Sequence, residues 1–489
     1  MAIRHYYTVI VGSGPGGLGV AEMLKHDPIM SPSTLILEKG NPLDQRVCAV
    51  REGKKCRSCE PCNILSGIGG AGPYTDGKIC LYPQDLGQLF SNPPGVDNKN
   101  EEISSKIDDY LRRCQQVWLS HGANDIREIT VDEKMEALKT DALRHGINYI
   151  CYPVLHIGSD GAAEVIRRYM EHLADSGITI ETKANVVSIR KTEREFQIKY
   201  EKVTPDGGTE NQEVTCDFLV LALGREMQKT AHVNQLVRDL QPLAFKPKNL
   251  EIGCRVEVPY QLMEDVIRIT FDPKFVMVAT TYQDSVRTFC TCHRGKVVRE
   301  GSCVNGHIDR SQVTQNTNFA LLVRWPLGTL LLDDAMDYGA TIAKLTLSLG
   351  RGKPVIQRLG DLRRGVCSTD ESIKRSHVKP SLRLGWMVEP GDIASCYPRR
   401  ITVDILEGLD KLGTVVAGIN DDQNLLYAPE IKPTCVVQLK EGVKTEIPNL
   451  YVCGDFSGHT RGIAQAMCMG IMVGEDILKE KEHLQLRLN

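Results

Sequence analysis

Three short, largely apolar runs shape the pattern of the N-terminal half of this chain. They are Tyr7–Val11, Thr34–Leu37 and Phe218–Leu223, and they are followed directly by Gly12, Glu38 and Gly224. Continuous apolar runs without alternation are typical of strands that are covered on both faces, as in a parallel sheet. The stretch after the first run is expected to form a helix.

Further elements are expected along the rest of the chain. Residues about 99–146 look helical, with Trp118 and Leu143 among the expected core positions. A helix at about 160–176 precedes strands near 178–190, 195–202 and 214–223, the last two joined by the turn-rich residues 204–208. The stretch 226–430 carries strands at 287–289 and 318–323 and helices at 335–349 and 401–412.

The first apolar run opens directly into Gly12-x-Gly14-x-x-Gly17, with Pro15 and Gly16 inside the motif. In a strand–turn–helix context Gly12 permits a tight turn, Gly14 lets the backbone approach a pyrophosphate, and Gly17 lets the helix pack close to the sheet. Glu38 lies 21 residues beyond Gly17, where an acid can accept hydrogen bonds from an adenosine ribose. The pattern predicts a site for FAD or NAD, and the alternative is a glycine-rich turn that binds nothing.

A segment near the other end of the chain distinguishes between the two nucleotides. Asn449-Leu450-Tyr451-Val452-Cys453-Gly454-Asp455 resembles the Gly-Asp motif of the glutathione-reductase-like FAD fold, in which a strand ends at an Asp that holds the flavin ribityl hydroxyls. The resemblance gives that role to Asp455. The apolar helix Ala464–Leu478 follows, and its start would face the pyrimidine edge of the flavin. The alternative is a buried terminal helix with Asp455 as its N-cap.

Matching motifs are spread over most of the chain. Besides the two ends they are Gly69–Lys78, Phe289–Cys292, Leu426–Lys432 and Thr460–Ala466. Together they resemble a little-characterised family of FAD-dependent dehydrogenases within the glutathione-reductase-type flavoproteins, a group of NAD(P)/FAD-dependent oxidoreductases. Many relatives read Cys-Pro-Gly-Gly where this chain has Cys292-His293-Arg294-Gly295, so the substrate does not follow from the resemblance.

The resemblance implies an α/β fold with a glutathione-reductase-type, Rossmann-like FAD-binding domain and a large inserted α+β substrate domain. We expect residues 1–225, which include the Cys-rich loop 48–62, and residues 431–489 to form the FAD-binding domain, and residues 226–430 to form the inserted domain. No second GxGxxG follows a strand, so a nicotinamide cofactor would enter by another route. The residues expected to bind FAD are Gly12, Gly14, Pro15, Gly16, Gly17, Glu38, Lys39, Gly70, Ala71, Gly72, Asp76, Gly77, Lys78, Val186, Gly224, Gly454, Asp455, Arg461, Gly462 and Ile463.

The composition is that of an ordinary globular protein. Apolar residues make up 42%, charged residues 25%, and the formal net charge is −3, so nothing points to nucleic acid or an acidic membrane. The chain runs straight into its first strand and no apolar run approaches 18 residues, so we expect a cytoplasmic protein without a signal peptide or membrane span. Seventeen cysteines in a reducing compartment are better explained as metal or redox groups than as a disulfide framework.

A group of closely spaced cysteines has the spacing of a metal site. Cys56, Cys59 and Cys62 are separated from one another by two residues each, and Cys48 lies eight positions upstream of Cys56. The arrangement resembles the ligands of a 4Fe–4S cluster more than a zinc ribbon, but four thiolates would also accept zinc. The third interpretation is a loop of metal-free thiols.

Candidate catalytic residues fall in three places. Cys292 and His293 stand out from a second cysteine- and histidine-rich group, and are interpreted as a redox-active thiol or general acid, as part of a zinc site, or as part of a cysteine-rich hairpin. His459 and Arg461 follow the ribityl Asp; Arg461 could hold a substrate carboxylate or stabilise the flavin N1 edge, and His459 could instead bond backbone. Tyr427 and Glu430 lie where the insertion rejoins, as a proton donor and acceptor.

The sequence therefore predicts an FAD-dependent oxidoreductase that moves a hydride between a small organic substrate and flavin N5. Reoxidation would involve NAD(P)⁺, an electron-carrier protein or the cysteine cluster, and the chain is a possible homo-oligomer. The alternatives are a flavin monooxygenase or oxidase that uses O₂, and a non-catalytic scaffold that keeps the flavoprotein fold.

Overall fold

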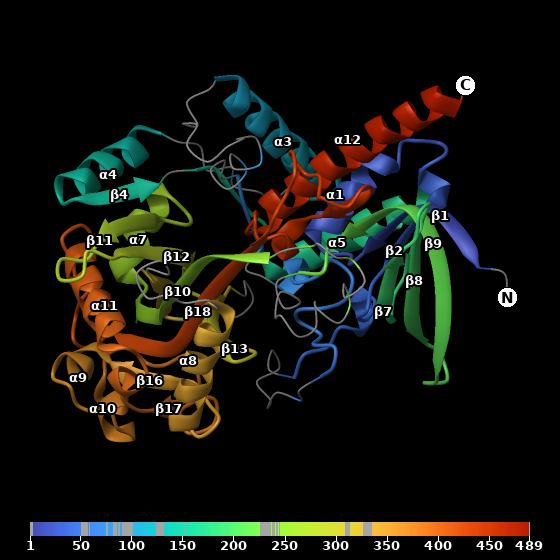
Figure 1. Cartoon of the computed structure of the whole chain (residues 1–489). Helices are drawn as coiled ribbons and strands as arrows, with labels where there is room; N and C mark the ends of the chain where they lie inside the picture. Colours follow the sequence, from blue (N-terminus) through green and yellow to red (C-terminus); the bar gives the residue numbers. More distant parts are fainter. Residues whose placement is uncertain are drawn as a thin grey trace. The chain divides into compact units, whose positions relative to one another are not determined.

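The computed structural model describes residues 3–49, 57, 59–74, 77–81, 86, 89, 101–123, 132–150, 152–224, 236, 240, 243, 245–308, 313–325 and 335–488 (Figure 1). The chain forms two compact units. Unit 1 comprises residues 1–126, 155–246 and 435–489, and unit 2 comprises residues 127–154 and 247–434. The expected mixture of helices and sheets is confirmed in both units.

Unit 1 is built on a seven-stranded sheet in the order β6-β2-β1-β9-β8-β7, with β19 paired to β9. Strands β6, β2, β1, β9 and β19 run parallel, while β9, β8 and β7 form an antiparallel arm. The strands of the unit are β1 (Arg4–Val11), β2 (Thr34–Leu37), β3 (Lys78–Cys80), β5 (Val154–His156, at the unit boundary), β6 (Thr179–Glu181), β7 (Ala184–Lys191), β8 (Phe196–Val203), β9 (Thr209–Leu221) and β19 (Leu450–Val452).

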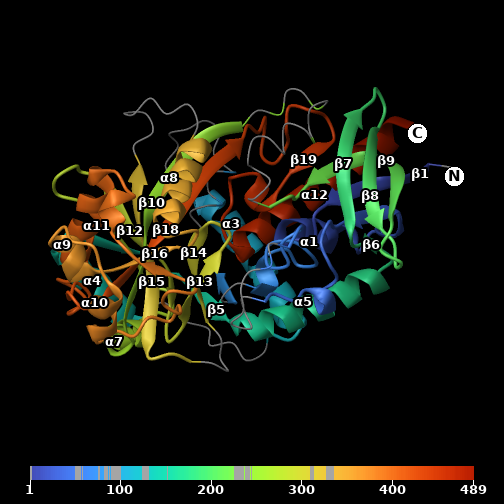
Figure 2. The same ribbon diagram turned by 90° about the horizontal axis from the view of Figure 1, so that it is seen from below.

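Helices cover this sheet. They are α1 (Pro15–Leu24), α3 (Glu101–Ser120), α5 (Gly158–Asp175) and α12 (Ile463–Leu488), with 3-10 turns η1 (Ser31–Ser33), η2 (Leu43–Gln45), η3 (Gly72–Tyr74) and η7 (Gly454–Phe456). Ile10 of β1 lies in one apolar core and its neighbours Val9 and Val11 lie in another, so β1 is buried on both faces as its apolar run predicted. Helices α1 and α12 lie side by side (Figures 1 and 2).

Unit 2 is built on an eight-stranded, mainly antiparallel sheet in the order β17-β16-β18-β10-β15-β12-β11-β4. Its strands are β4 (Ile147–Ile150), β10 (Phe245–Pro259), β11 (Lys274–Val278), β12 (Ser285–Cys292), β15 (Asn316–Trp325), β16 (Val355–Arg358), β17 (Glu389–Pro390) and β18 (Leu425–Val437), and a separate hairpin joins β13 (Lys296–Glu300) to β14 (Cys303–His307). Its helices are α4 (Glu133–Arg144), α7 (Gln261–Ile269), α8 (Ala335–Leu349), α9 (Leu359–Arg363), α10 (Asp370–Arg375) and α11 (Arg399–Leu412), with the 3-10 turn η6 (Ile393–Ser395).

The central strand β10 has two different faces. Cys254, Val256 and Val258 belong to an apolar core that includes Ile405 and Leu409 of α11. The side chains at the alternate positions, Glu251, Arg255 and Glu257, point to the opposite face because side chains alternate along a strand. Glu251, Arg255 and Glu257 are nevertheless buried, at 1%, 0% and 0% exposure. A buried polar face on a central strand is unusual, and it positions the site described below.

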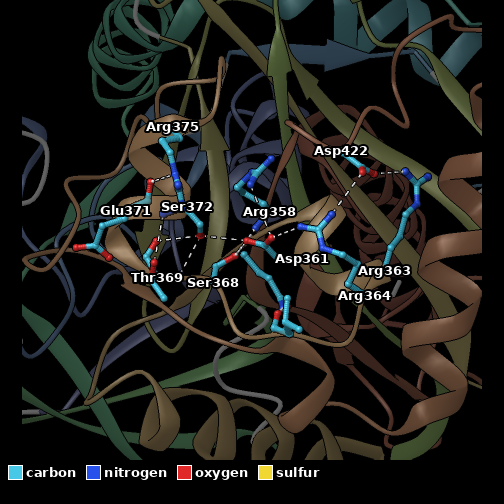
Figure 3. Close-up of polar contacts among 12 residues, drawn as sticks. Arg358, Asp361, Arg363, Arg364, Ser368, Thr369, Glu371, Ser372, Arg375 and Asp422 are labelled. Atoms are coloured by element: carbon cyan, nitrogen blue, oxygen red, sulfur yellow. Dashed lines mark hydrogen bonds and ion pairs between the residues drawn. The ribbon is translucent and has the colours of Figure 1, made fainter.

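A polar network around Asp361 holds two short helices at the end of β16 (Figure 3). The Asp361 carboxylate accepts hydrogen bonds from Ser368 Oγ at 2.6 Å, Ser372 Oγ at 3.0 Å and Arg364 Nη2 at 2.6 Å. Thr369 caps α10 through its Oγ1, which accepts from the backbone N–H of Ser372 at 3.2 Å. Helices of five and six residues are not stable alone, so these bonds anchor α9 and α10.

Two local expectations differ from the structure. The helical stretch expected at 99–146 is two helices, α3 and α4, and β4 begins directly after α4 and pairs with β11. Because of this pairing residues 127–154 belong to unit 2, whereas the expected boundaries had put them with the FAD-binding domain; the domain boundaries themselves stay a prediction. Trp118 is buried as expected, but Leu143 is 57% exposed, because it lies on the outer face of α4.

Candidate functional site

The glycine motif after β1 has the close contacts that its spacing predicts. Gly12 has a φ of +105°, and a Cβ there would lie 2.3 Å from the carbonyl oxygen of Ala222. A Cβ on Gly17 would lie 2.1 Å from the carbonyl oxygen of Gly12, so only glycine lets α1 start this close to the sheet. Gly14, by contrast, would accept a Cβ without a clash, in ordinary contact with Gly70 Cα at 3.9 Å. Pro15 is the first residue of α1.

The two predicted halves of the dinucleotide site meet inside unit 1. A Cβ on Gly16 would lie 2.9 Å from the backbone nitrogen of Gly454, and one on Gly470 would lie 2.0 Å from the carbonyl oxygen of Gly16. Strand β19 pairs with β9, which pairs with β1, so Gly454 follows a strand of the same parallel sheet as Gly12. Residues almost 440 positions apart in the sequence are therefore in contact at the start of α1.

The glycine-rich segment after the Cys-rich loop closes on this motif. The backbone N–H of Gly69 donates to Ser13 O at 3.1 Å, and a Cβ on Gly70 would lie 2.9 Å from Gly14 Cα. Ala71 and Gly72 continue this turn. The turn at Gly70 therefore packs directly against Gly14, which a residue without a side chain permits.

Four further residues, Lys39, Asp76, Gly77 and Lys78, were also expected to bind FAD. Gly77 has a φ of +69° and packs on the backbone of Gly158, and Lys78 is buried at the start of β3. Asp76 lies outside the described residues. Lys39 is half-buried after Glu38.

The Glu38 carboxylate accepts hydrogen bonds from groups of the protein itself. One oxygen accepts from Ser13 N at 3.0 Å and Ser13 Oγ at 2.8 Å, and the other accepts from Gly40 N and Gly67 N, both at 2.9 Å. A carboxylate has about four acceptor positions, and all four are filled here. The expected ribose contact of Glu38 stays a prediction, and a ribose hydroxyl would have to displace one of these donors.

The segment after β19 places the remaining flavin candidates at the start of α12. Asp455 is half-buried in η7, Gly462 has a φ of +104°, and Ile463 begins the helix. His459 Nε2 lies 2.9 Å from the backbone oxygen of Val437, which is the backbone-bonding alternative for this residue. Arg461 is half-buried in the same loop.

Thr460, which the sequence did not single out, is 1% exposed, and its Oγ1 has no hydrogen-bond partner among the described residues. An unpartnered buried hydroxyl fits a polar ligand at this helix start. Two further expected contacts lie elsewhere in unit 1: Val186 is half-buried in β7, and Gly224 follows β9 with a φ of +74° and open space around it.

Unit 2 holds a second set of candidate residues around a cation that sequence reasoning missed. Arg255 of β10 donates from Nε to Asn318 Oδ1 at 2.7 Å and from Nη2 to Cys290 O at 2.6 Å and Cys292 Sγ at 3.2 Å. Its Nη1 lies 3.5 Å from Glu430 Oε1. The predicted residues Cys292 and Glu430 are therefore brought to opposite ends of one guanidinium.

The atoms of this cluster are incompletely paired. Both carboxylate oxygens of Glu430, Arg255 Nη1 and Asn318 Nδ2 are buried without a hydrogen-bond partner among the described residues. Lys432 Nζ lies 3.5 Å from the same Glu430 oxygen. Burial lowers the pKa of Arg255, but the neighbouring Glu430 and cysteine sulfurs outweigh it, and the pKa is raised. The guanidinium therefore stays charged.

Tyr427 and His293 have other partners. The Tyr427 hydroxyl donates to Glu257 Oε2 and not to Glu430, and burial together with the Glu257 carboxylate raises the pKa of Tyr427. Burial raises the pKa of Glu257. His293 Nδ1 contacts Thr317 Oγ1 at 2.9 Å, and burial and Arg294 lower the pKa of His293. The six candidate catalytic residues are thus divided: His459 and Arg461 lie in unit 1 and the other four in unit 2.

A signal for the missed residues was present in the sequence. Glu251, Arg255 and Glu257 alternate with apolar residues in the strand that became β10. Alternation normally marks a half-exposed strand. Only the position of β10 in the middle of the sheet shows that this polar face is buried.

The Cys-rich loop is held at both of its ends. Arg46 donates to the backbone oxygens of Asn63, Ile64 and Ile68 at 2.9, 2.9 and 2.6 Å, and Asn63 Nδ2 donates to Val47 O at 3.0 Å. Of the predicted metal ligands, Cys48 is half-buried, Cys59 and Cys62 are exposed, and Cys56 lies outside the described residues.

Within the described part of the chain, no group of three or more His, Cys, Asp or Glu side chains is arranged to hold a metal. The metal site at Cys48–Cys62 stays a prediction. The structure gives no support to a zinc site among Cys292, His293, Cys303 and His307, which all belong to the described residues. The described helices include none with the length and apolar character of a membrane span.

Comparison with known proteins bears on unit 2 most directly. Residues 249–433 match the family model described as FAD-dependent protein, C-terminal domain-like. The expected kinship with FAD-dependent proteins is confirmed for this stretch, whereas a glutathione-reductase-type family is not distinguished. No curated protein matches the sequence.

Solved structures give only weak similarities. Aklavinone-11 hydroxylase in complex with FAD and aklavinone is 12% identical over 99% of this chain and 64% of its own, with a TM-score of 0.40. Glycine oxidase from Geobacillus kaustophilus is 11% identical over 97% and 95% of the two chains, with a TM-score of 0.39. This chain thus spans less than two thirds of the hydroxylase, and similarities of this strength assign it no activity.

Proposed function

We propose that the protein is an FAD-dependent oxidoreductase that moves a hydride between a small organic substrate and N5 of the flavin. The observation that carries the proposal is the contact of Gly16 with Gly454, which joins the two predicted halves of a dinucleotide site. The match of residues 249–433 to FAD-dependent proteins supports the same cofactor. FAD supplies the hydride chemistry when bound, and the protein supplies binding, orientation and electrostatics.

The residues of unit 1 would hold the cofactor as follows. The backbone at Gly14 and the N–H groups at the start of α1 would bind the pyrophosphate. Asp455 would accept hydrogen bonds from the ribityl hydroxyls. The start of the 26-residue helix α12, at Gly462 and Ile463, would place its partial positive charge beside the flavin ring.

Unit 2 holds further candidate groups for proton transfer. Tyr427 would exchange a proton with Glu257, its observed partner, so the proton-donor pair differs from the Tyr427–Glu430 pair expected from the sequence. Glu430 remains a candidate proton acceptor because both of its oxygens lack a hydrogen bond among the described residues. Cys292, His293, His459 and Arg461 stay candidates for substrate contact.

The electron partner belongs to the same proposal. NAD(P)H, a carrier protein or a cluster ligated by Cys48, Cys56, Cys59 and Cys62 could exchange electrons with the flavin, and the spacing of these cysteines is the support for the cluster. A cytoplasmic location and a possible homo-oligomer complete the proposal.

An anaerobic visible spectrum of the protein, repeated after NADH, NADPH and dithionite, tests this function. We expect flavin bands that a reductant bleaches, with slow reoxidation in air. A shoulder that bleaches separately, together with iron and acid-labile sulfide that disappear in Cys59→Ala, would support the cluster. Rapid reoxidation coupled to substrate would select an oxygen-using enzyme instead, and flavin that no donor reduces would select a scaffold.

A further inference from the structure

The charges around Arg255 do not balance among the groups described so far. Arg255 and Lys432 are two cations that share one carboxylate, Glu430, at 3.5 Å each. Arg255 and Glu430 are fully buried, and the Lys432 side chain is only 14% exposed. An uncompensated charge in such surroundings strongly destabilises the folded protein. A second anion is therefore expected beside the cluster.

Glu257 is the weaker candidate for this anion. It lies on the same face of β10 as Arg255, but no ion pair joins them within the described residues. Burial raises the pKa of Glu257, whereas the hydrogen bonds that its Oε2 accepts from the Tyr427 hydroxyl and from the backbone N–H of Ser381 lower it. Without an ion pair to Arg255 among the described residues, its charge would not compensate the guanidinium directly.

The sulfur of Cys292 has the better geometry. Arg255 Nη2 donates to it at 3.2 Å, and the guanidinium is fixed in plane by the bond from Nε to Asn318. The thiol's own acceptor, the carbonyl of Cys290, lies 3.6 Å away and already receives Nη2 at 2.6 Å. A charged acceptor strengthens a guanidinium hydrogen bond, so this contact favours the ionised sulfur.

The backbone at Gly306 and Cys290 accommodates the contact between Arg255 and Cys292. A Cβ on Gly306 would lie 1.7 Å from Arg255 Nη2, so a side chain there would push the guanidinium away from the sulfur. Cys290 has a φ of +51° at a bulge between Phe289 and Cys292, which turns its carbonyl toward Arg255. Strained backbone of this kind persists only where the surroundings fix it.

We propose that Cys292 is an ionised thiol in the folded protein, with Arg255 as its counter-ion, and that it forms a soft nucleophilic centre in unit 2. The proposal is independent of flavin binding, because every group it uses belongs to unit 2. Among the described residues, the ionisable groups at the sulfur or at its counter-ion include Arg255, Glu430, Lys432 and Cys290, with Cys303 beside Glu430 and Lys432, and Glu257 with Tyr427 on the same face of β10.

A pH titration of ultraviolet thiolate absorbance tests the proposal without requiring a reagent to reach the buried sulfur. The signal of Cys292 is obtained by subtracting the absorbance of Cys292→Ser from that of the wild-type protein. The flavin absorbance is common to both proteins and cancels in this difference. We expect this difference to titrate at least about one pH unit below the ordinary thiol midpoint of about 8.5. A midpoint at or above that value overturns the proposal, as does a protonated sulfur accompanied by a co-purifying small anion.

Cys254 provides the matched control. It is the residue before Arg255 on β10, it is fully buried on the apolar face, and burial raises the pKa of its thiol. The difference between wild type and Cys254→Ser should therefore be flat through the neutral range.

Arg255→Met should move the Cys292 titration up by about one pH unit or more, and Arg255→Lys should restore part of the shift. An unchanged midpoint in a folded Arg255→Met protein contradicts the role of Arg255. If Arg255→Met does not fold, the titration difference between wild type and Cys292→Ser alone tests the proposal. Cys292→Ser keeps the Arg255–Glu430 pair and is therefore expected to fold.

Discussion

The protonation of some buried carboxyl groups in unit 2 depends on the fold. Asp404 of α11 is a clear case. It is fully buried, and neither carboxylate oxygen has a hydrogen-bond partner among the described residues. Burial and the neighbouring Asp284 carboxylate raise the pKa of Asp404 to about 7, although Arg400 opposes the shift. Asp284 itself is held by Arg400, whose Nη2 donates to it at 2.7 Å.

The raised pKa makes stability depend on pH in a definite direction. The folded protein holds the Asp404 proton up to about pH 7, whereas the unfolded chain releases it near pH 4, so this stabilisation is lost as the pH rises between these values. The Asn side chain of Asp404→Asn is uncharged at every pH. Above about pH 7 we therefore expect the free energy of unfolding of this variant to exceed that of the wild type by on the order of 2 kcal/mol.

Calorimetry of both proteins from about pH 4 to pH 8 measures the effect, and the gap in melting temperature should widen with pH. Asp265→Asn is the control, because the Asp265 side chain is 95% exposed and its substitution should leave the curve unchanged. Parallel curves for wild type and Asp404→Asn would contradict the assignment.

At the scale of elements, the contact of α1 with α12 depends on residues without side chains. A Cβ on Gly470 would lie 2.0 Å from Gly16 O, and a Cβ on Gly19 would lie 2.2 Å from Met467 O. Both obstacles are backbone, so the helices would have to separate. We expect Gly470→Ala to destabilise the protein by about 1–3 kcal/mol and to weaken retention of flavin, because Gly16 belongs to the proposed site.

Gly161→Ala is the matched helical control. Gly161 lies in α5, where a Cβ would meet only Ile157 Cβ at 3.4 Å, and the substitution should stabilise by up to about 1 kcal/mol. Chemical denaturation of the two variants gives the comparison. A Gly470→Ala protein as stable as wild type would show that the helices are not packed as described.

For the whole molecule, the sequence predicted those features that local geometry imposes. The roles of Gly12 and Gly17 follow from one strand, one turn and one helix, and the structure has the expected close approaches. The hairpin of β8 and β9 was also predicted, as were β12, β15, α8 and α11 of the inserted stretch, whereas its other elements, β10 among them, were not. Leu143 was misjudged because an apolar residue on an amphipathic helix need not lie on its buried face.

The remaining features depend on contacts between distant segments. Glu38 is engaged by the amide of Gly67, which sequence spacing does not place beside it. The Arg255 cluster takes side chains from β10, β12, β15 and β18, whose order in the sheet is set by long-range pairing. Local patterns could identify the charged positions on β10, but not that β12, which lies beyond β15 in the sheet, would supply a thiol to one of them.

The central claim is that the two ends of the chain form one FAD site. The most direct measurement is to release bound nucleotide by denaturing the purified native protein, and to identify and count it by chromatography. We predict about one FAD per chain, with strongly reduced content in Asp455→Ala. A folded protein that contains no flavin, and takes up none when FAD is supplied, would contradict the account.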